Sequence, residues 1–234
     1  MTTSMGRLDW KNIASQLAAE GCAVLRGLIG RDLARTWTEQ LIDTPLRSLS
    51  RENGWVDGEI RLLEDVDLPT PLDAWRRQLY ERLVPVANSW NKTMGNSNCF
   101  PPKWAEFLAD NHAAGQRRAQ SFVHRLRDSE YQALHQCRDG EHIFPMQLVA
   151  LLSEPGKDFV GGELVMTEQR PRIQSRPLVV PLGFGDAALI ATARRPLKGR
   201  HGYYSVNTKH AVSRVRRGER VGLELSFHFA PAER

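Results

Sequence analysis

The chain has 234 residues, which suffices for one full-sized domain whose core needs neither a disulfide nor a metal to hold it. Its net charge of +5 comes mostly from arginine, a side chain suited to bidentate contact with carboxylate or phosphate, so anionic substrates and nucleic acid are both admissible partners. The apolar runs are too short to span a membrane and no leader pattern opens the chain, so we expect a cytoplasmic protein without a membrane partner. Three widely spaced cysteines exclude a disulfide framework and a C-x-x-C zinc clip, and no particular oligomeric state is predicted.

The first half of the chain carries helical patterns. Trp10, Ile13 and Leu17 recur at helical spacing after a possible N-cap at Asp9, and Gly21 ends the pattern. Similar patterns predict helices over 31–41, 72–90 and 104–115, with a short strand over 22–28 and a loop over 50–71. Pro85 is expected to kink or divide the helix over 72–90.

From about residue 121 the pattern changes to short β-rich runs separated by Gly, Pro and charged turns. The expected strands are 144–153, 162–167, 178–182, 186–192, 203–206, 211–215 and 221–229. We therefore predict one α+β domain over 1–234, in which mainly helical residues 1–120 support a sandwich or jelly-roll core over 121–234.

Four residues of the second half have the spacing of a metal and cosubstrate site. His135 and Cys137 are two residues apart, so in a strand they would face the same side, and His210 could approach them from a distant strand. Two histidines and a carboxylate arranged in this way form a facial triad that leaves coordination positions open on iron. Arg220, ten residues after His210, could pair with the distal carboxylate of a dicarboxylate cosubstrate.

These motifs resemble those of the oxygenases that depend on iron(II) and 2-oxoglutarate, and within them a prokaryotic group named for the oxidation of nucleic acids. The resemblance runs from about residue 10 to 229, and it is clearest over 134–136, 140–147, 151–163, 167–172 and 206–214. It implies a double-stranded β-helix in which His135 and His210 bind Fe(II) and Arg220 binds 2-oxoglutarate. By the same resemblance, Tyr204 and Asn207 would line the cosubstrate pocket.

Cys137 departs from the family pattern, which has aspartate at this position. As a thiolate, Cys137 could bind the metal itself, and the softer ligand set would widen the choice of metal towards copper or zinc. Alternatively Asp139 could act as the substitute ligand if the chain folds back before Gly140. A third alternative leaves the position without a protein ligand, as in relatives that halogenate their substrates.

The resemblance implies an enzyme that uses O2 to oxidise a C–H bond, with His135, Cys137 and His210 as its catalytic metal site. A small-molecule substrate is our first expectation, because the arginines are scattered along the chain. Oxidative demethylation of damaged nucleic acid is the first alternative, and it requires a basic groove and a pocket for a flipped base. The second alternative is a metal-binding protein or pseudoenzyme with a His/Cys/His copper or iron site that does not turn over 2-oxoglutarate.

Overall fold

A computed structural model describes residues 5–42, 46–48, 56–170, 174–200 and 202–232 of the chain. Its helices are α1 (Trp10–Glu20), α2 (Arg31–Ile42), α3 (Leu72–Thr93) and α4 (Trp104–Ala113), with two short 3-10 turns at Met5–Arg7 and Asp65–Asp67. Among these helices none is both long enough and apolar enough to cross a membrane. The helices begin and end close to the positions that their apolar spacing predicts.

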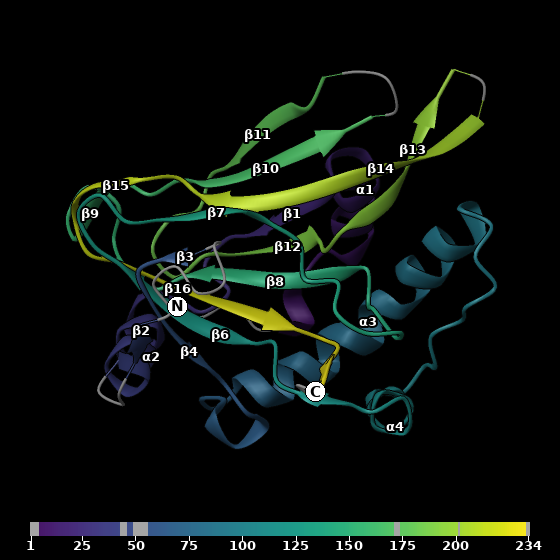
Figure 1. Cartoon of the computed structure of the whole chain (residues 1–234), viewed down its shortest axis with the longest axis horizontal. Coiled ribbons are helices and arrows are strands. Elements are labelled where there is room, and N and C mark those ends of the chain that lie inside the picture. Colours follow the sequence, from purple (N-terminus) through teal and green to yellow (C-terminus); the bar gives the residue numbers. More distant parts are fainter. Residues whose placement is uncertain (1–4, 43–45, 49–55, 171–173, 201, 233–234) are drawn as a thin grey trace.

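Two antiparallel sheets face each other, and hairpins of the smaller one project beyond the larger (Figure 1). Within the described residues, the larger sheet has the order β1 (Cys22–Leu25), β12 (Ala187–Ala191), β8 (Met146–Leu151), β16 (Arg220–Ser226), β6 (Phe122–Leu126), β4 (Glu59–Leu62) and β2 (Arg47–Ser48). The smaller sheet has the order β11 (Arg176–Val180), β10 (Leu164–Gln169), β14 (Gly202–Val212), β7 (Tyr131–His135) and β3 (Val56–Asp57), and β13 (Arg194–Gly199) also pairs with β14. Two small ribbons complete the strands, β9 (Phe159–Gly161) with β15 (Val215–Gly218) and β5 (Gln116–Arg118) with β17 (Ala230–Pro231).

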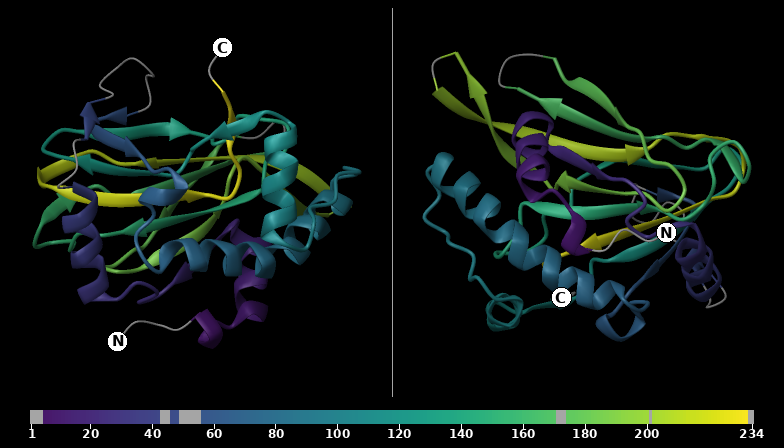
Figure 2. Two further views of the ribbon diagram at one scale, coloured as in Figure 1. Left: turned by 90° about the horizontal axis from the view of Figure 1, so that it is seen from below. Right: turned by 180° about the vertical axis from the view of Figure 1, so that it is seen from behind.

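The helices pack against the larger sheet and shield its outer face from solvent (Figure 2). Tyr80 of α3 and Phe107 of α4 stack at 4.9 Å between ring centroids, and Phe227 lies just beyond the end of β16 in the same apolar cluster. Buried aromatic rings of this size dominate the apolar area removed from water. This layer therefore holds the larger sheet in place from behind and leaves its inner face to the site.

Helix α3 continues through Pro85 as one helix, so the expected division of this helix does not occur. A proline inside a helix removes one backbone hydrogen bond, which by itself favours a break. Here the side chains around it, Leu83, Val84 and Ala87, are buried against the core. Tertiary packing of the apolar face offsets the local cost.

The N-terminal half contributes strands as well as helices. The loop expected over 50–71 contains β3 and β4 within its described part, from residue 56 onwards, and β4 pairs with β6 next to the central strand β16. Conversely, the strand expected at 203–206 and the first residues of the strand expected at 211–215 belong to the single long strand β14, and Val215 begins β15. The middle of β14 is polar in sequence, but its backbone is paired with other strands. β13 pairs with residues 202–207, β10 pairs with residues 207–212, and β7 pairs with His210 and Val212.

Candidate metal centre and cosubstrate site

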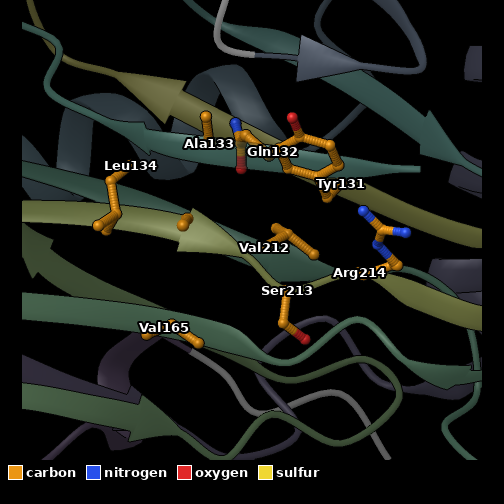
Figure 3. A pocket seen from close by; sticks show the side chains of 9 residues that line it. Tyr131, Gln132, Ala133, Leu134, Val165, Val212, Ser213 and Arg214 are labelled. Atoms are coloured by element: carbon orange, nitrogen blue, oxygen red, sulfur yellow. The ribbon is translucent and has the colours of Figure 1, made fainter. Parts of the chain in front are cut away.

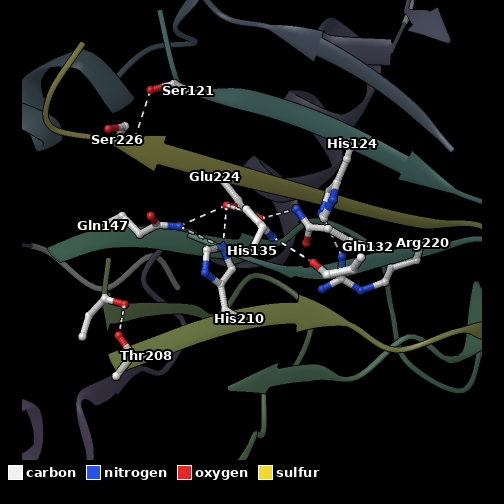
Figure 4. Close-up of polar contacts among 12 residues, drawn as sticks. Ser121, His124, Gln132, His135, Gln147, Thr208, His210, Arg220, Glu224 and Ser226 are labelled. Atoms are coloured by element: carbon white, nitrogen blue, oxygen red, sulfur yellow. Dashed lines mark hydrogen bonds and ion pairs between the residues drawn. The ribbon is translucent and has the colours of Figure 1, made fainter. Parts of the chain in front are cut away.

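Three strands bring two histidines and one glutamate together between the sheets. His135 lies at the end of β7, His210 lies in β14 opposite it, and Glu224 lies in the middle of β16 across the barrel (Figure 4). One ligand atom from each of the three lies within 4.8 Å of the other two. His210 Nε2 is 3.0 Å and His135 Nε2 is 3.8 Å from the same carboxylate oxygen, Glu224 Oε2.

A β-bulge in β7 turns His135 towards this centre. His135 pairs with His210 and Gln132 pairs with Val212, so three steps along β7 match two steps along β14. The extra residue lets both Gln132 and His135 face inwards, which strict alternation would forbid. Ala133 and Leu134 between them line a pocket on the exposed surface of the sheet (Figure 3).

The backbone also fixes the tautomer of His135. Its Nδ1 lies 3.0 Å from the carbonyl oxygen of Ala133, and because that oxygen can only accept, Nδ1 donates the proton. The other ring nitrogen, Nε2, is the atom that faces Glu224. A ligating histidine in a metalloprotein is oriented in the same way by a carbonyl on its other nitrogen.

Glu224 is a buried carboxylate held by amide donors and imidazoles. Gln132 Nε2 donates to Glu224 Oε1 at 2.8 Å, and Gln147 Nε2 donates to Glu224 Oε2 at 3.0 Å. Burial opposes ionisation, but the imidazoles of His210 and His135 hold the pKa of Glu224 well below its ordinary value. Burial and the neighbouring His135 lower the pKa of His210, which favours a neutral ring.

An ionised carboxylate and neutral imidazoles are the protonation states in which these side chains bind a metal. The group offers two nitrogen ligands and one oxygen ligand, the donor set of a facial triad for Fe(II). The residues present therefore fit a metal, although the carboxylate comes from a different strand than the sequence pattern implies.

Comparison with known proteins gives the family. Residues 58–230 match the model of a family described as an oxygenase catalysing oxidative methylation of damaged DNA. An uncharacterised protein of Mycobacterium tuberculosis, recorded from two strains, is 36% identical over 166 residues, covering 69% of this chain and 71% of the relative. The chain belongs to this oxygenase family.

Solved structures place the family member in a known fold. An oxidoreductase of the 2-oxoglutarate and Fe(II) oxygenase family from Burkholderia pseudomallei matches with a TM-score of 0.59 at 16% identity, covering 100% of this chain and 99% of that one. A prolyl-4-hydroxylase from Pseudomonas putida matches with a TM-score of 0.56 at 14% identity, covering 96% and 100% of the two chains. The predicted α+β double-stranded β-helix is confirmed.

Arg220 of this oxygenase is a buried cation whose contacts are all neutral. Its Nε donates to the carbonyl oxygen of Gly162 at 2.8 Å, its Nη1 lies 3.0 Å from His124 Nε2, and its guanidinium is 5.9 Å from the ring centre of Phe159. Among the described residues no carboxylate lies within ion-pair distance of it, and burial lowers its pKa to about 10. A buried charge without a counterion is costly, so this position favours an anionic ligand.

Two glycines make room for Arg220. A Cβ on Gly162, where φ is +63°, would lie 2.8 Å from Arg220 Cδ. A Cβ on Gly222 would overlap His124 Nε2 and lie 2.6 Å from Arg220 Nη1. His124 is fully buried, and burial together with Arg220 lowers its pKa to about 3, so the ring stays neutral and accepts from the guanidinium.

The structure places Cys137 and Asp139 outside the group formed by His135, His210 and Glu224. Strand β7 ends at His135, so the alternation that would turn residue 137 towards the metal does not extend that far. Burial and the charges of Glu224 and Asp139 raise the pKa of the Cys137 thiol, which favours the protonated form. The Asp139 side chain is 69% exposed and faces Arg118 at 4.0 Å, so the chain does not fold back as a substitute ligand requires.

Tyr204 and Asn207 do not reach the metal centre. Tyr204 shares a face of β14 with His210 but is six residues away, about 20 Å along a strand, and packs over Gly199. Asn207 is exposed on the opposite face and accepts a hydrogen bond from Arg194 Nε at 3.3 Å. The polar side chains that do contact the histidine and glutamate group are Gln132 and Gln147, which both donate to Glu224.

Glu224 is the functional candidate that the sequence reasoning missed. In the run over 221–229, the alternating apolar residues that predict a strand pack against the helices. Arg220, Gly222 and Glu224 occupy the other phase of the same strand, and that face points into the barrel. The signal in the sequence is a carboxylate four residues after Arg220, inside an otherwise apolar run.

Proposed function

We propose that this protein is an oxygenase that depends on Fe(II) and 2-oxoglutarate and oxidises a C–H bond of an organic substrate. The observation that carries the proposal is that Glu224, the carboxylate that lies with His135 and His210, shares strand β16 with Arg220, which has no ion-pair partner among the described residues. Arg220 and Glu224 are four residues apart on β16 and face the same side. A dicarboxylate with one end on Arg220 and the other on a metal held by Glu224 and the histidines would complement both.

Each side chain has a defined task in this proposal. His135 and His210 would hold the metal through Nε2, and Glu224 would supply the carboxylate oxygen. Arg220 would bind the distal carboxylate of 2-oxoglutarate, and His124 would keep the guanidinium aimed inwards. When bound, iron and 2-oxoglutarate couple the decarboxylation of the cosubstrate to succinate with the oxidation of the substrate by O2.

Glu224 and Cys137 are competing proposals for the third ligand. Glu224 is favoured because it already lies with both histidines and carries the negative charge that the metal needs. Cys137 would have to lose a proton against burial and against the charge of Glu224. The two proposals predict different variants to fail.

Metal binding separates them. We would titrate the parent, Glu224→Gln, Cys137→Ala and Cys137→Asp with Co(II) anaerobically and follow visible absorption, then measure succinate from 2-oxoglutarate with Fe(II) and O2. Ligation by Glu224 predicts that Glu224→Gln loses metal affinity about 10-fold or more and that Cys137→Ala keeps it. Loss of affinity in Cys137→Ala alone would assign the third ligand to the thiolate.

For the substrate we propose damaged nucleic acid, because the matching family is described as acting on damaged DNA. A small-molecule substrate is the second candidate, and it is supported by a cavity of about 430 Å³ whose walls adjoin the metal centre. A metal protein without turnover, the third candidate, predicts no succinate with any metal. Succinate release that a methylated oligonucleotide stimulates, and the unmethylated strand does not, would support the first.

A further inference from the structure

A cavity of about 430 Å³ opens at the end of the barrel where β7 ends at His135. Asn91, Met94, Asn96, Gln136, Arg138, Ile143, Pro145, Ala193 and Arg194 line it. They come from the end of α3, the segment after β7 and the start of β13, which lie at the end of the barrel where the hairpins project (Figure 1). The lining combines apolar side chains with amides, as small-molecule sites do.

Two wall segments continue along the chain into residues of the metal centre. Gln136 follows His135, and its Nε2 donates to the carbonyl oxygen of Thr208 at 2.8 Å, two residues before His210. Pro145 lies two residues before Gln147, and the Gln147 side chain contacts both His210 and Glu224. A ligand in this cavity is therefore next to the groups that would hold the metal.

The charge of the cavity is positive. Arg138 and Arg194 both line it, neither forms an ion pair with a described residue, and no acidic side chain belongs to the lining. Arg194 donates one hydrogen bond, from Nε, to the side-chain oxygen of the neutral Asn207. A neighbouring cavity of about 210 Å³ shares Asn91, Asn96 and Ile143 but is lined by Asp110 and Glu141, so an anion is favoured only on the arginine side.

We propose that this cavity is a substrate subsite for a nucleoside phosphate unit, with Arg138 and Arg194 on the phosphate and the apolar wall of Met94, Ile143 and Pro145 against the base. The proposal rests on the proposed function, because it places the unit to be oxidised beside the metal. Arginine forks bind phosphate oxygens bidentately. The amide of Asn96 supplies donors and an acceptor for the edge of a base, and the side-chain oxygens of Asn91 and Gln136, whose nitrogens donate to backbone carbonyls, supply further acceptors.

Binding of a fluorescein-labelled single-stranded oligonucleotide to the full chain, followed by anisotropy over a range of salt concentrations, tests this subsite. The variants are Arg138→Gln, Arg194→Gln and the double substitution. Arg217→Gln is the matched control, because Arg217 is an exposed arginine of β15 at the opposite end of the barrel (Figure 1). Thermal unfolding of every variant checks that it is folded.

Each cavity substitution should weaken binding about two- to fivefold, as exposed ion pairs do, and lower the salt slope by about one. The control should change both by clearly less. Equal losses in the control, parental binding by the double variant, or no binding by the parent would each overturn the subsite.

Competition identifies the source of the phosphate. A nucleoside monophosphate that displaces the oligonucleotide shows that the free unit suffices, and a polymer that resists it shows that flanking phosphates add affinity; both support the subsite. Displacement by inorganic phosphate at the same concentration would overturn the role of the base.

Co(II) uptake by the parent distinguishes this failure from failure of the proposed function. A protein that binds Co(II) but is indifferent to both arginines loses only the subsite. Binding that depends on the arginines in a protein without a metal site would remove the oxygenase proposal and leave the subsite.

Discussion

Replacing Gly222 by alanine adds one methyl group at the most crowded point of the barrel interior. That methyl would overlap His124 Nε2 and lie 2.6 Å from Arg220 Nη1, both on buried side chains. Inserting a methyl group into a packed interior costs about 1 to 3 kcal/mol of unfolding free energy. For a chain of this length that lowers the melting temperature by roughly 2 to 12 °C.

The same substitution should also weaken 2-oxoglutarate binding, because it displaces the guanidinium that would receive the distal carboxylate. Urea unfolding gives the stability change, and anaerobic titration of the Fe(II) protein gives the affinity. Gly183→Ala is the control, since Gly183 has ordinary backbone angles and its nearest atom, Asp186 Oδ2, would be 3.2 Å from the new Cβ. We expect less than about 1 kcal/mol there.

A double-mutant cycle with His124→Ala tests the cause. If the methyl group of Gly222→Ala collides with the imidazole, removing the ring should recover part of the loss, with a coupling energy of about 0.5 to 3 kcal/mol. Strictly additive costs, or a Gly222→Ala protein as stable as the parent, would refute the packing described for Arg220 and His124.

Two further outcomes are expected. Arg195 is 1% exposed, forms an ion pair with Glu168 and donates to carbonyl oxygens at the end of α1. Arg195→Ala should therefore lower the free energy of unfolding, measured in urea, by about 2 to 4 kcal/mol. A variant as stable as the parent would contradict a structural role for this buried side chain. Burial raises the pKa of the Cys22 thiol to about 11 and also raises the pKa of the Cys137 thiol. At pH 8 iodoacetamide should therefore label the exposed Cys99 first, and the labelling rate of Cys22 should rise about 10-fold per pH unit up to pH 11. A Cys137 that reacts as fast as Cys99 would argue for a thiolate at that position.

The local patterns of the sequence predict most helices and the strands of the second half. Asp9 accepts a hydrogen bond from the backbone N–H of Asn12 at 3.0 Å and Gly21 has φ +71°, as the cap and stop signals of α1 require. The short strands β3 and β4 escape a local prediction because the strands that join them to the sheets, β7 and β6, lie 60 or more residues away. Such pairings depend on chain topology, which a local window does not contain.

The candidate site was likewise predictable only where local sequence motifs carry it. His135, His210 and Arg220 carry family motifs, and the structure brings the histidines together and keeps Arg220 buried. The motif spacing alone assigned the third position to Cys137, because it assumes an unbroken strand through residue 137. The bulge in β7 and its end at His135 break that assumption, and Glu224 becomes a neighbour only through the pairing of β16 with β6 and β8.

Strand β16 carries both Arg220 and Glu224, and it is paired along both edges in the middle of the larger sheet. Four residues of extended chain separate their Cα atoms by about 13 Å, and no hinge or loop lies between them. Because β16 is regular and paired, it fixes the distance between these two Cα atoms. That distance in turn limits the length of a diacid that could reach from Arg220 to a metal held by Glu224.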